Sequence, residues 1–158
     1  MKRFTIILFI LFIGSVAAQE VVFQKFYTVN KVKSTFSINL SASLAGSFLD
    51  DNEDSDLMNI IKKSSDFQVM IFDNEDHVIS KDFRKFIRKN QLKTFARIIK
   101  NGSKAELFFT EKNNYIREII IRANSTDDKL VLFGLKTKIT KDELAAIISS
   151  SDSKVSLN

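Results

Sequence analysis

Six basic residues lie within a thirteen-residue stretch of this 158-residue chain: Lys81, Arg84, Lys85, Arg88, Lys89 and Lys93. If the stretch is a helix, Phe83, Phe86 and Ile87 face the interior and the cations share the outer face. Such a face contacts anionic surfaces such as lipid headgroups, acidic polysaccharides or acidic proteins. Arg97 and Lys100 would extend the patch along the next segment. A solvated helix face opposite a core stripe accounts for the same spacing, so both interpretations stand.

The acidic residues resemble a calcium loop only at its beginning. Oxygen ligands stand at alternate positions: Asp50, Asn52, Asp54 and Asp56. A calcium loop also needs glycine at its sixth position and a bidentate glutamate at its twelfth, where this chain has Ser55 and Ile61. His77 is the only histidine and there is no cysteine, so a zinc site lacks ligands. The sequence therefore predicts a helix-capping acidic loop, no metal site and no cofactor.

No arrangement of residues indicates catalysis. No serine lies in a Gly-x-Ser-x-Gly turn, and four glycines are too few for a glycine-rich phosphate loop. The remaining candidates for an acid–base pair are carboxylates in or beside predicted strands: Asp66, Asp73, Glu106 and Glu118. Strand-end and solvent-facing charge is the simpler interpretation of each. We predict that the protein is not an enzyme; the alternative is an envelope enzyme whose carboxylate pair forms only in the fold.

The second half of the chain has the pattern of four short strands in succession. Apolar segments are cut by Asn, Gly, Asp and Ser, and they cover 91–100, 104–110, 114–123 and 129–138. Asn101-Gly102 suits a tight hairpin, because both residues tolerate positive φ. Neighbouring apolar residues point to opposite faces of such a meander: Phe108 and Phe109, Ile119 and Ile120, Leu132 and Phe133. Both faces therefore need cover, from helices or from a partner. Binding of a partner by the sheet is the interpretation that we prefer, and helices covering both faces are the alternative.

The upstream segments predict two early strands and several helices. The strands are 31–39 and 66–73, and helices are expected over 40–49, over 57–63 and after a cap at Ser80. Residues 20–27 form either a short helix or an edge segment, with Phe23, Phe26 and Tyr27 on one helical face. A capping box over 140–143 begins a final helix that carries Leu144, Ile147 and Ile148. Strands segregated in this way predict an α+β fold with a mostly antiparallel sheet: two early strands plus a C-terminal four-strand meander, with helices packed on it.

The first eighteen residues have the pattern of a secretory signal peptide. Lys2 and Arg3 precede an apolar run over 4–13, and Val16-Ala17-Ala18 supplies small residues for cleavage. An uncleaved N-terminal anchor is the alternative. We expect a single domain over 19–149 and a flexible tail over 150–158, with no transmembrane span after cleavage. Without cysteine the chain has no site for an N-terminal lipid, so we expect a periplasmic or secreted protein that is not lipid-anchored.

The order of these features resembles a known family. The signal peptide, the segment VVFQKFY, a strand, paired helices, a second strand and a late four-strand meander closed by a capped helix are similar to the domain of unknown function 4252 family of small exported bacterial proteins. The resemblance runs from Val21 to about Ser149. Relatives carry a lipobox cysteine that this chain lacks, so membrane anchoring is not implied here. The family has no assigned activity, and the resemblance therefore implies fold and export but no catalytic residue.

These observations together predict a non-enzymatic exported protein of the cell envelope that acts as a binding or interaction module. The expected partner is an envelope protein or an anionic surface. The formal charge of +5 is modest, and export argues against nucleic acid as the partner.

Overall fold

The computed structural model describes residues 21–41, 44, 63–100, 102–124 and 128–155. The predicted signal peptide and the acidic loop at 50–56 lie outside the described residues. Of the helix predicted over 57–63, only Lys63 is described, and it lies in a turn. Within the described residues, no helix combines the length and the apolar character needed to cross a membrane.

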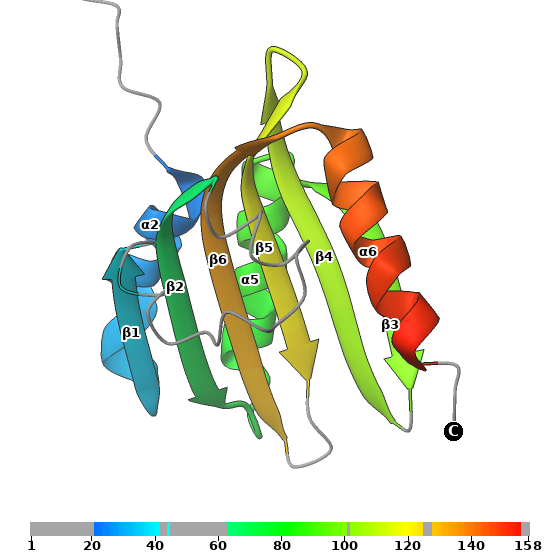
Figure 1. The fold of residues 1–158 in the computed structure, drawn as a ribbon. Coiled ribbons are helices and arrows are strands. Elements are labelled where there is room, and N and C mark those ends of the chain that lie inside the picture. Colours follow the sequence, from blue (N-terminus) through cyan, green and yellow to red (C-terminus); the bar gives the residue numbers. More distant parts are fainter. Residues whose placement is uncertain (1–20, 42–43, 45–62, 101, 125–127, 156–158) are drawn as a thin grey trace, which may run out of the picture.

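A six-stranded antiparallel sheet forms the centre of the fold (Figure 1). Its strands are β1 Phe36–Ser41, β2 Ser64–Asp73, β3 Lys93–Lys100, β4 Ser103–Lys112, β5 Tyr115–Asn124 and β6 Lys129–Ile139. The order across the sheet is β1-β2-β6-β5-β4-β3, so the meander β3 to β6 is extended by the two early strands. This arrangement confirms the predicted α+β class.

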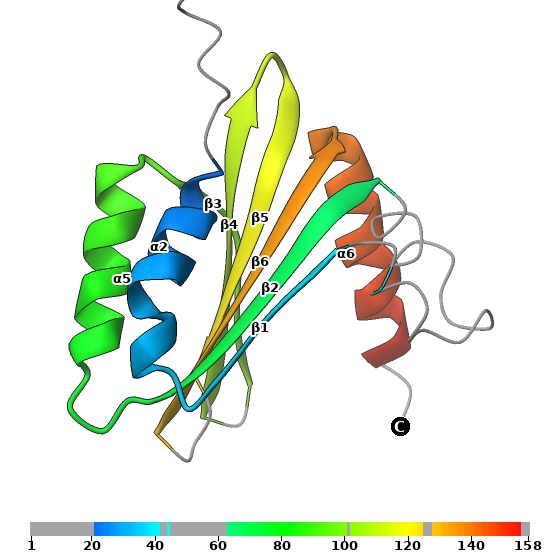
Figure 2. The same cartoon turned by 90° about the vertical axis from the view of Figure 1, so that its left-hand side faces the viewer.

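Helices pack on both faces of the sheet. They are α2 Val22–Asn30, α5 Val78–Lys89 and α6 Lys141–Val155, and a short 3-10 helix, η1 Lys31–Lys33, follows α2. Figure 2 shows α2 and α5 side by side on one face and α6 on the other. The sheet is therefore the middle layer of three, and α5 lies over the strands on the side opposite α6.

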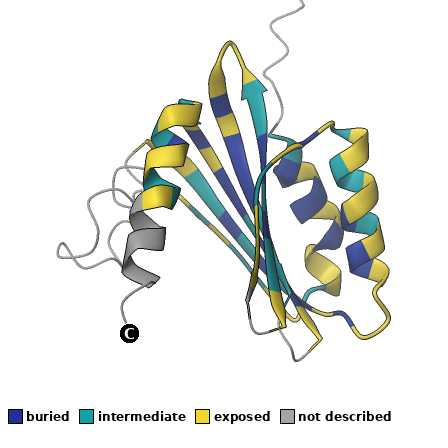
Figure 3. Ribbon diagram, turned by 90° about the vertical axis from the view of Figure 1, so that its right-hand side faces the viewer, coloured by how far each residue is buried: buried dark blue, intermediate teal, exposed yellow. Residues whose placement is uncertain are grey.

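Alternation along the strands supplies a separate core to each face. Phe108 and Ile120 join a cluster with Phe23, Phe26 and Phe83 of the two helices α2 and α5. Their neighbours in sequence, Phe109 and Ile119, join a second cluster with Leu144 of α6. Figure 3 shows the buried residues running along the strands between the helix layers. The prediction that adjacent apolar residues point to opposite faces is confirmed.

The first predicted strand is wrong at its beginning and too short at its end. Residues 31–33 form η1, and Val32 is 81% exposed. The side-chain amide of Asn30 donates to the Phe26 carbonyl at 3.0 Å and holds the last turn of α2, and the helical conformation continues from there into η1. The strand then continues through Leu40, which was assigned to a helix over 40–49. Leu40 pairs with Phe67 across the ladder, and of the remaining residues of 42–49 only Leu44 is described.

Helix α5 begins at Val78 with His77 as its N-cap, three residues before the predicted cap at Ser80. The Asp76 carboxylate accepts from the Val78 N–H at 2.9 Å, and the Asn74 side-chain oxygen accepts from the Ser80 N–H at 3.3 Å. Two side chains from the preceding turn thus satisfy the first free N–H groups. Ser80 is consequently a buried residue of the first turn, and its hydroxyl accepts a hydrogen bond from Arg122 on β5.

Helix α6 starts at the predicted capping box and ends later than predicted. The Thr140 N–H donates to the Glu143 carboxylate at 2.7 Å, and the Glu143 N–H donates to the Thr140 hydroxyl at 3.2 Å. The helix continues to Val155, so residues 150–155 of the predicted flexible tail are helical. Extending a helix that has already begun fixes one residue for each new hydrogen bond, which costs less than starting one.

Candidate functional site

Five of the six predicted basic residues share the outer surface of α5. Phe83 is fully buried beneath the helix, while the cations are exposed: Lys81, Arg84, Lys85, Arg88 and Lys89. This is the amphipathic arrangement expected from the spacing. The sequence prediction was correct about which side of the helix carries the charge.

Lys93 is separated from this cluster, contrary to the prediction. It is the first residue of β3 and lies opposite Phe109, whose side chain belongs to the α6 face. Residues opposite each other on neighbouring strands point to the same face, so Lys93 emerges on the side away from α5. Its Nζ lies 2.8 Å from Glu111 Oε2, and this ion pair gives it a different role from the helix cations.

A cavity of about 640 Å³ lies between α5 and strands β3, β4 and β5. Four of its cations come from α5 and three from the strands: Lys81, Arg84, Lys85, Arg88, Arg97, Lys104 and Arg122. Glu106 is the only acidic residue among the described residues that line it, and Ile87 and Phe108 complete the wall. We call this cavity the basic pocket. It carries a surplus of six formal positive charges.

The strand residues of the basic pocket are neighbours in the sheet register. Arg97 on β3 lies opposite Glu106 on β4, and Glu106 lies opposite Arg122 on β5. Lys104 precedes Glu106 by two residues and therefore shares its face. The sequence prediction included Arg97 as an extension of the patch but missed Lys104 and Arg122. Alternation within β4 and β5 indicates which residues of each strand share a face. Placing Lys104 and Arg122 beside Arg97 also requires the register between the strands, which alternation does not give.

Glu106 holds the strand cations together. Its side chain is 6% exposed, and its carboxylate oxygens lie 2.9 Å from Arg97 Nε, 3.2 Å from Lys104 Nζ and 3.2 Å from Arg122 Nη1. Burial alone would raise the pKa of Glu106, but the hydrogen bond from Lys104 and the attraction of the three cations outweigh it and lower the pKa below its ordinary value. One carboxylate therefore serves three cations and stays charged at neutral pH.

Arg122 is the most buried of the three strand cations, with its side chain 13% exposed. Its Nη1 contacts Glu106, and its Nη2 donates to the Ser80 hydroxyl at 3.3 Å. Its Nε is buried, with no hydrogen-bond partner among the described residues. Burial, together with repulsion from Arg84, lowers the pKa of Arg122 against the attraction of Glu106. The guanidinium remains charged, because its ordinary pKa lies far above neutral.

Two of the four carboxylates that the sequence left as a catalytic alternative, Glu106 and Glu118, lie in different parts of the sheet. Glu118 accepts from the Phe23 N–H at 2.9 Å and from the Thr110 hydroxyl at 3.2 Å, and so ties the start of α2 to the sheet. Its ladder partner Thr110 is four residues from Glu106 along β4, which places the two backbone positions ~13 Å apart. The two glutamates belong to separate structural networks.

The single histidine has a structural position. His77 is the N-cap of α5 in the left-handed region, with φ of 57°, and its Nδ1 lies 3.3 Å from the Asn74 side-chain nitrogen. Among the described residues no group of three or more His, Asp or Glu side chains is placed to hold a metal ion.

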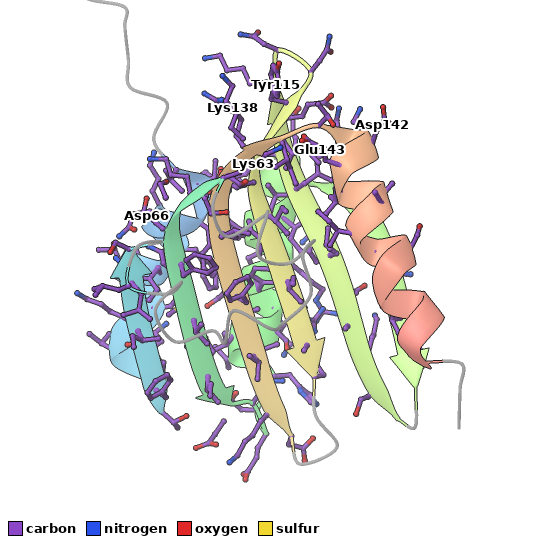
Figure 4. All side chains as sticks on the ribbon, viewed as in Figure 1. Lys63, Asp66, Tyr115, Lys138, Asp142 and Glu143 are labelled. Carbon is purple, nitrogen blue, oxygen red and sulfur yellow. The ribbon has the colours of Figure 1, made fainter. Side chains whose placement is uncertain are left out.

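A larger cavity, of about 810 Å³, opens near the start of α2. Figure 4 shows Lys63 and Glu143 together and Lys138 beside Tyr115 at that end of the sheet. Lys63 forms an ion pair with Glu143, and Lys138 Nζ lies 5.1 Å from the centre of the Tyr115 ring. Lys93 is likewise paired with an acid, so several cations of this cavity are already partnered. The residues that line this larger cavity carry a surplus of three formal positive charges, half the surplus of the basic pocket.

Comparison with known proteins identifies a family. No curated protein and no solved structure matches the chain. A family model described as a domain of unknown function (DUF4252) matches residues 27–147, which include all the described strands, the whole of α5 and parts of α2 and α6. Because this match covers more than half of the chain, the protein belongs to the domain of unknown function 4252 family.

Proposed function

We propose that this protein is a non-enzymatic, exported binding module of the cell envelope that contacts anionic partners through α5 and the basic pocket. The observation that carries the proposal is that seven cations and only one carboxylate line the basic pocket. Four of these cations lie on one helix that faces outward, and three come from the strands beneath it. The same surface is thus positive at its rim and at its base.

The energetics favour a surface over a single charge as the partner. A basic residue close to an anionic membrane contributes on the order of 1 kcal/mol, so four acting together contribute about 4 kcal/mol. Screening over about 8 Å at physiological salt weakens such contacts steeply as salt rises. A salt-sensitive contact with an anionic surface is therefore the expected behaviour.

Vesicle co-sedimentation tests this contact. The purified protein is expected to bind vesicles that contain anionic lipid, to bind neutral vesicles weakly, and to lose binding at high salt. Reversing the charge of four α5 cations is expected to abolish the anionic preference: Arg84→Glu, Lys85→Glu, Arg88→Glu and Lys89→Glu. All four side chains are exposed, so the fold should persist, as circular dichroism can check.

A matched control separates local charge from net charge. A second variant reverses four exposed lysines outside the basic pocket: Lys31→Glu, Lys33→Glu, Lys112→Glu and Lys129→Glu. It changes the formal charge by the same amount and is expected to keep most of the anionic preference. Equal binding by the wild-type protein and the α5 variant would refute the proposed surface.

Export has its own test. If the N-terminal segment is a cleaved signal peptide, mass spectrometry of protein recovered from the periplasm or medium should find a mature N-terminus at Gln19 or within a residue or two. Recovery of the chain with Met1 intact from those fractions would contradict export by cleavage.

A further inference from the structure

We infer that the basic pocket is a discrete site for the phosphate group of a phosphate monoester. This inference rests on the proposed function and names the chemistry of the ligand. The outer cations of α5 can contact any anionic surface. The pocket adds three strand cations, of which Arg122 is buried, and two apolar side chains, and these features select one kind of group.

The charge of the pocket calls for more than one negative charge. Glu106 supplies the single carboxylate of the lining and is shared among three cations. Of the four α5 cations at the rim, Lys85 also lies 3.4 Å from Asp82 on the same helix. A phosphate monoester carries about 1.5 to 2 negative charges at neutral pH and three acceptor oxygens. A carboxylate carries one charge, so it would offset less of the surplus in the same space.

The donor geometry favours phosphate as well. Guanidinium groups reach the pocket from three separate elements, with Arg88 on α5, Arg97 on β3 and Arg122 on β5. Planar guanidinium forks match the oxygens of phosphate, and a lysine acts there as a point charge. The Nε of Arg122 is without a partner among the described residues, although two other nitrogens of the same group are bonded. An unpaired buried donor is costly, and an additional acceptor oxygen near this guanidinium would reduce that cost.

The size and the apolar wall indicate that the phosphate is attached to an organic group. The volume of about 640 Å³ lies within the range of small-molecule sites, about 300 to 1,000 Å³. Ile87 and Phe108 line the pocket beside the cations. Phe108 is a core residue, so the half-buried Ile87 offers most of this carbon surface next to the charged donors. A phosphorylated small molecule or a lipid headgroup with a terminal phosphate meets both requirements.

Isothermal titration calorimetry with glycerol 3-phosphate tests the site directly, with acetate as the carboxylate comparison. We expect saturable binding of glycerol 3-phosphate that is at least tenfold tighter than binding of acetate. The double substitution Arg97→Gln and Lys104→Gln should weaken it at least tenfold. Both side chains are substantially exposed, at 57% and 41%, so this variant should stay folded, as its melting temperature will show. Arg117→Gln, an exposed cation on β5 outside the basic pocket, should leave the affinity unchanged.

Vesicles that contain phosphatidic acid identify the source of the phosphate. If the natural ligand is a headgroup, glycerol 3-phosphate should displace the protein from these vesicles; if it is a soluble molecule, binding to the vesicles should be unaffected by this competitor. Absence of saturable binding to glycerol 3-phosphate, or equal binding by the double variant, would overturn the inference. In that event salt-sensitive binding to anionic vesicles would still support the proposed function. Saturable binding of glycerol 3-phosphate without binding to vesicles would refute the proposed contact with anionic surfaces and support the phosphate site.

Discussion

Replacing Glu106 with glutamine is expected to lower the free energy of unfolding at neutral pH by about 3 kcal/mol, the lower end of the cost of breaking a buried ion pair. The lower end applies because Arg97 and Lys104 are half exposed and can be hydrated again when the carboxylate is lost. Arg122 cannot, since its side chain is 13% exposed. Most of the effect therefore comes from leaving one guanidinium buried without a counter-ion.

The same substitution should change how stability depends on pH. The cations lower the pKa of Glu106 in the folded state, so its contribution to stability is fully present above the unfolded-state pKa of about 4.3 and is lost as pH falls through the lowered folded value. The difference between the wild-type protein and Glu106→Gln should therefore be largest near neutral pH and should shrink in strong acid. Glu111 and Glu143 also have lowered pKa values, chiefly through hydrogen bonds from Lys93 and Lys63, but both are present in each protein.

Urea unfolding at neutral, mildly acidic and strongly acidic pH measures both effects. The matched control is Glu75→Gln, which removes the same charge from an exposed turn before α5 and should change stability by less than about 0.5 kcal/mol. A loss below about 1 kcal/mol for Glu106→Gln would contradict the view that Arg122 depends on this carboxylate. An unchanged difference in strong acid would contradict the assignment of the pH dependence to Glu106.

The sheet was predictable where the pattern is local. The strands of the meander alternate strongly, so Phe108 and Phe109 could be assigned to opposite faces without knowledge of the fold. The face of α5 was predictable for the same reason, because Phe83, Phe86 and Ile87 repeat at helical spacing. The early strand was harder, since Leu40 fits both the strand alternation and a helical repeat with Leu44. Pairing with β2 decides that case, and pairing is not local.

The basic pocket was only half predictable, because it depends on the register of three strands. A β-bulge in β3 lies between Thr94 and Ala96, where Phe95 is the additional residue. Strict alternation from Thr94, which lies opposite Phe108, would point Arg97 toward the α6 face. The additional residue reverses the alternation and places Arg97 opposite Glu106 on the α5 face. No feature of single residues in this segment indicates the bulge, so the convergence on Glu106 appears only in the fold.

Replacing Gly134 with alanine is expected to destabilise the protein by about 2–3 kcal/mol, the usual cost of forcing an extra group into a packed core. Gly134 lies on β6 beneath α2, where a Cβ would stand 2.0 Å from Cδ1 of Phe23. The ring cannot move away freely, because Phe23 is 1% exposed and lies between Phe26 and Phe86, at centroid distances of 6.1 Å and 6.4 Å. The close approach of helix and strand thus requires a residue without a side chain.

A double-mutant cycle with Phe23→Ala isolates this contact. Phe23→Ala alone should cost about 3–5 kcal/mol, because it removes a fully buried ring from the first core. In that background Gly134→Ala should cost little, since the new methyl group enters the space that the ring occupied. The expected coupling is therefore about 2 kcal/mol in favour of the double variant, measured by urea unfolding with circular dichroism. Additive losses would show that Gly134 is needed for the strand itself and not for the approach of α2. The start of α2 is also held to the sheet by the hydrogen bond from the Phe23 N–H to Glu118.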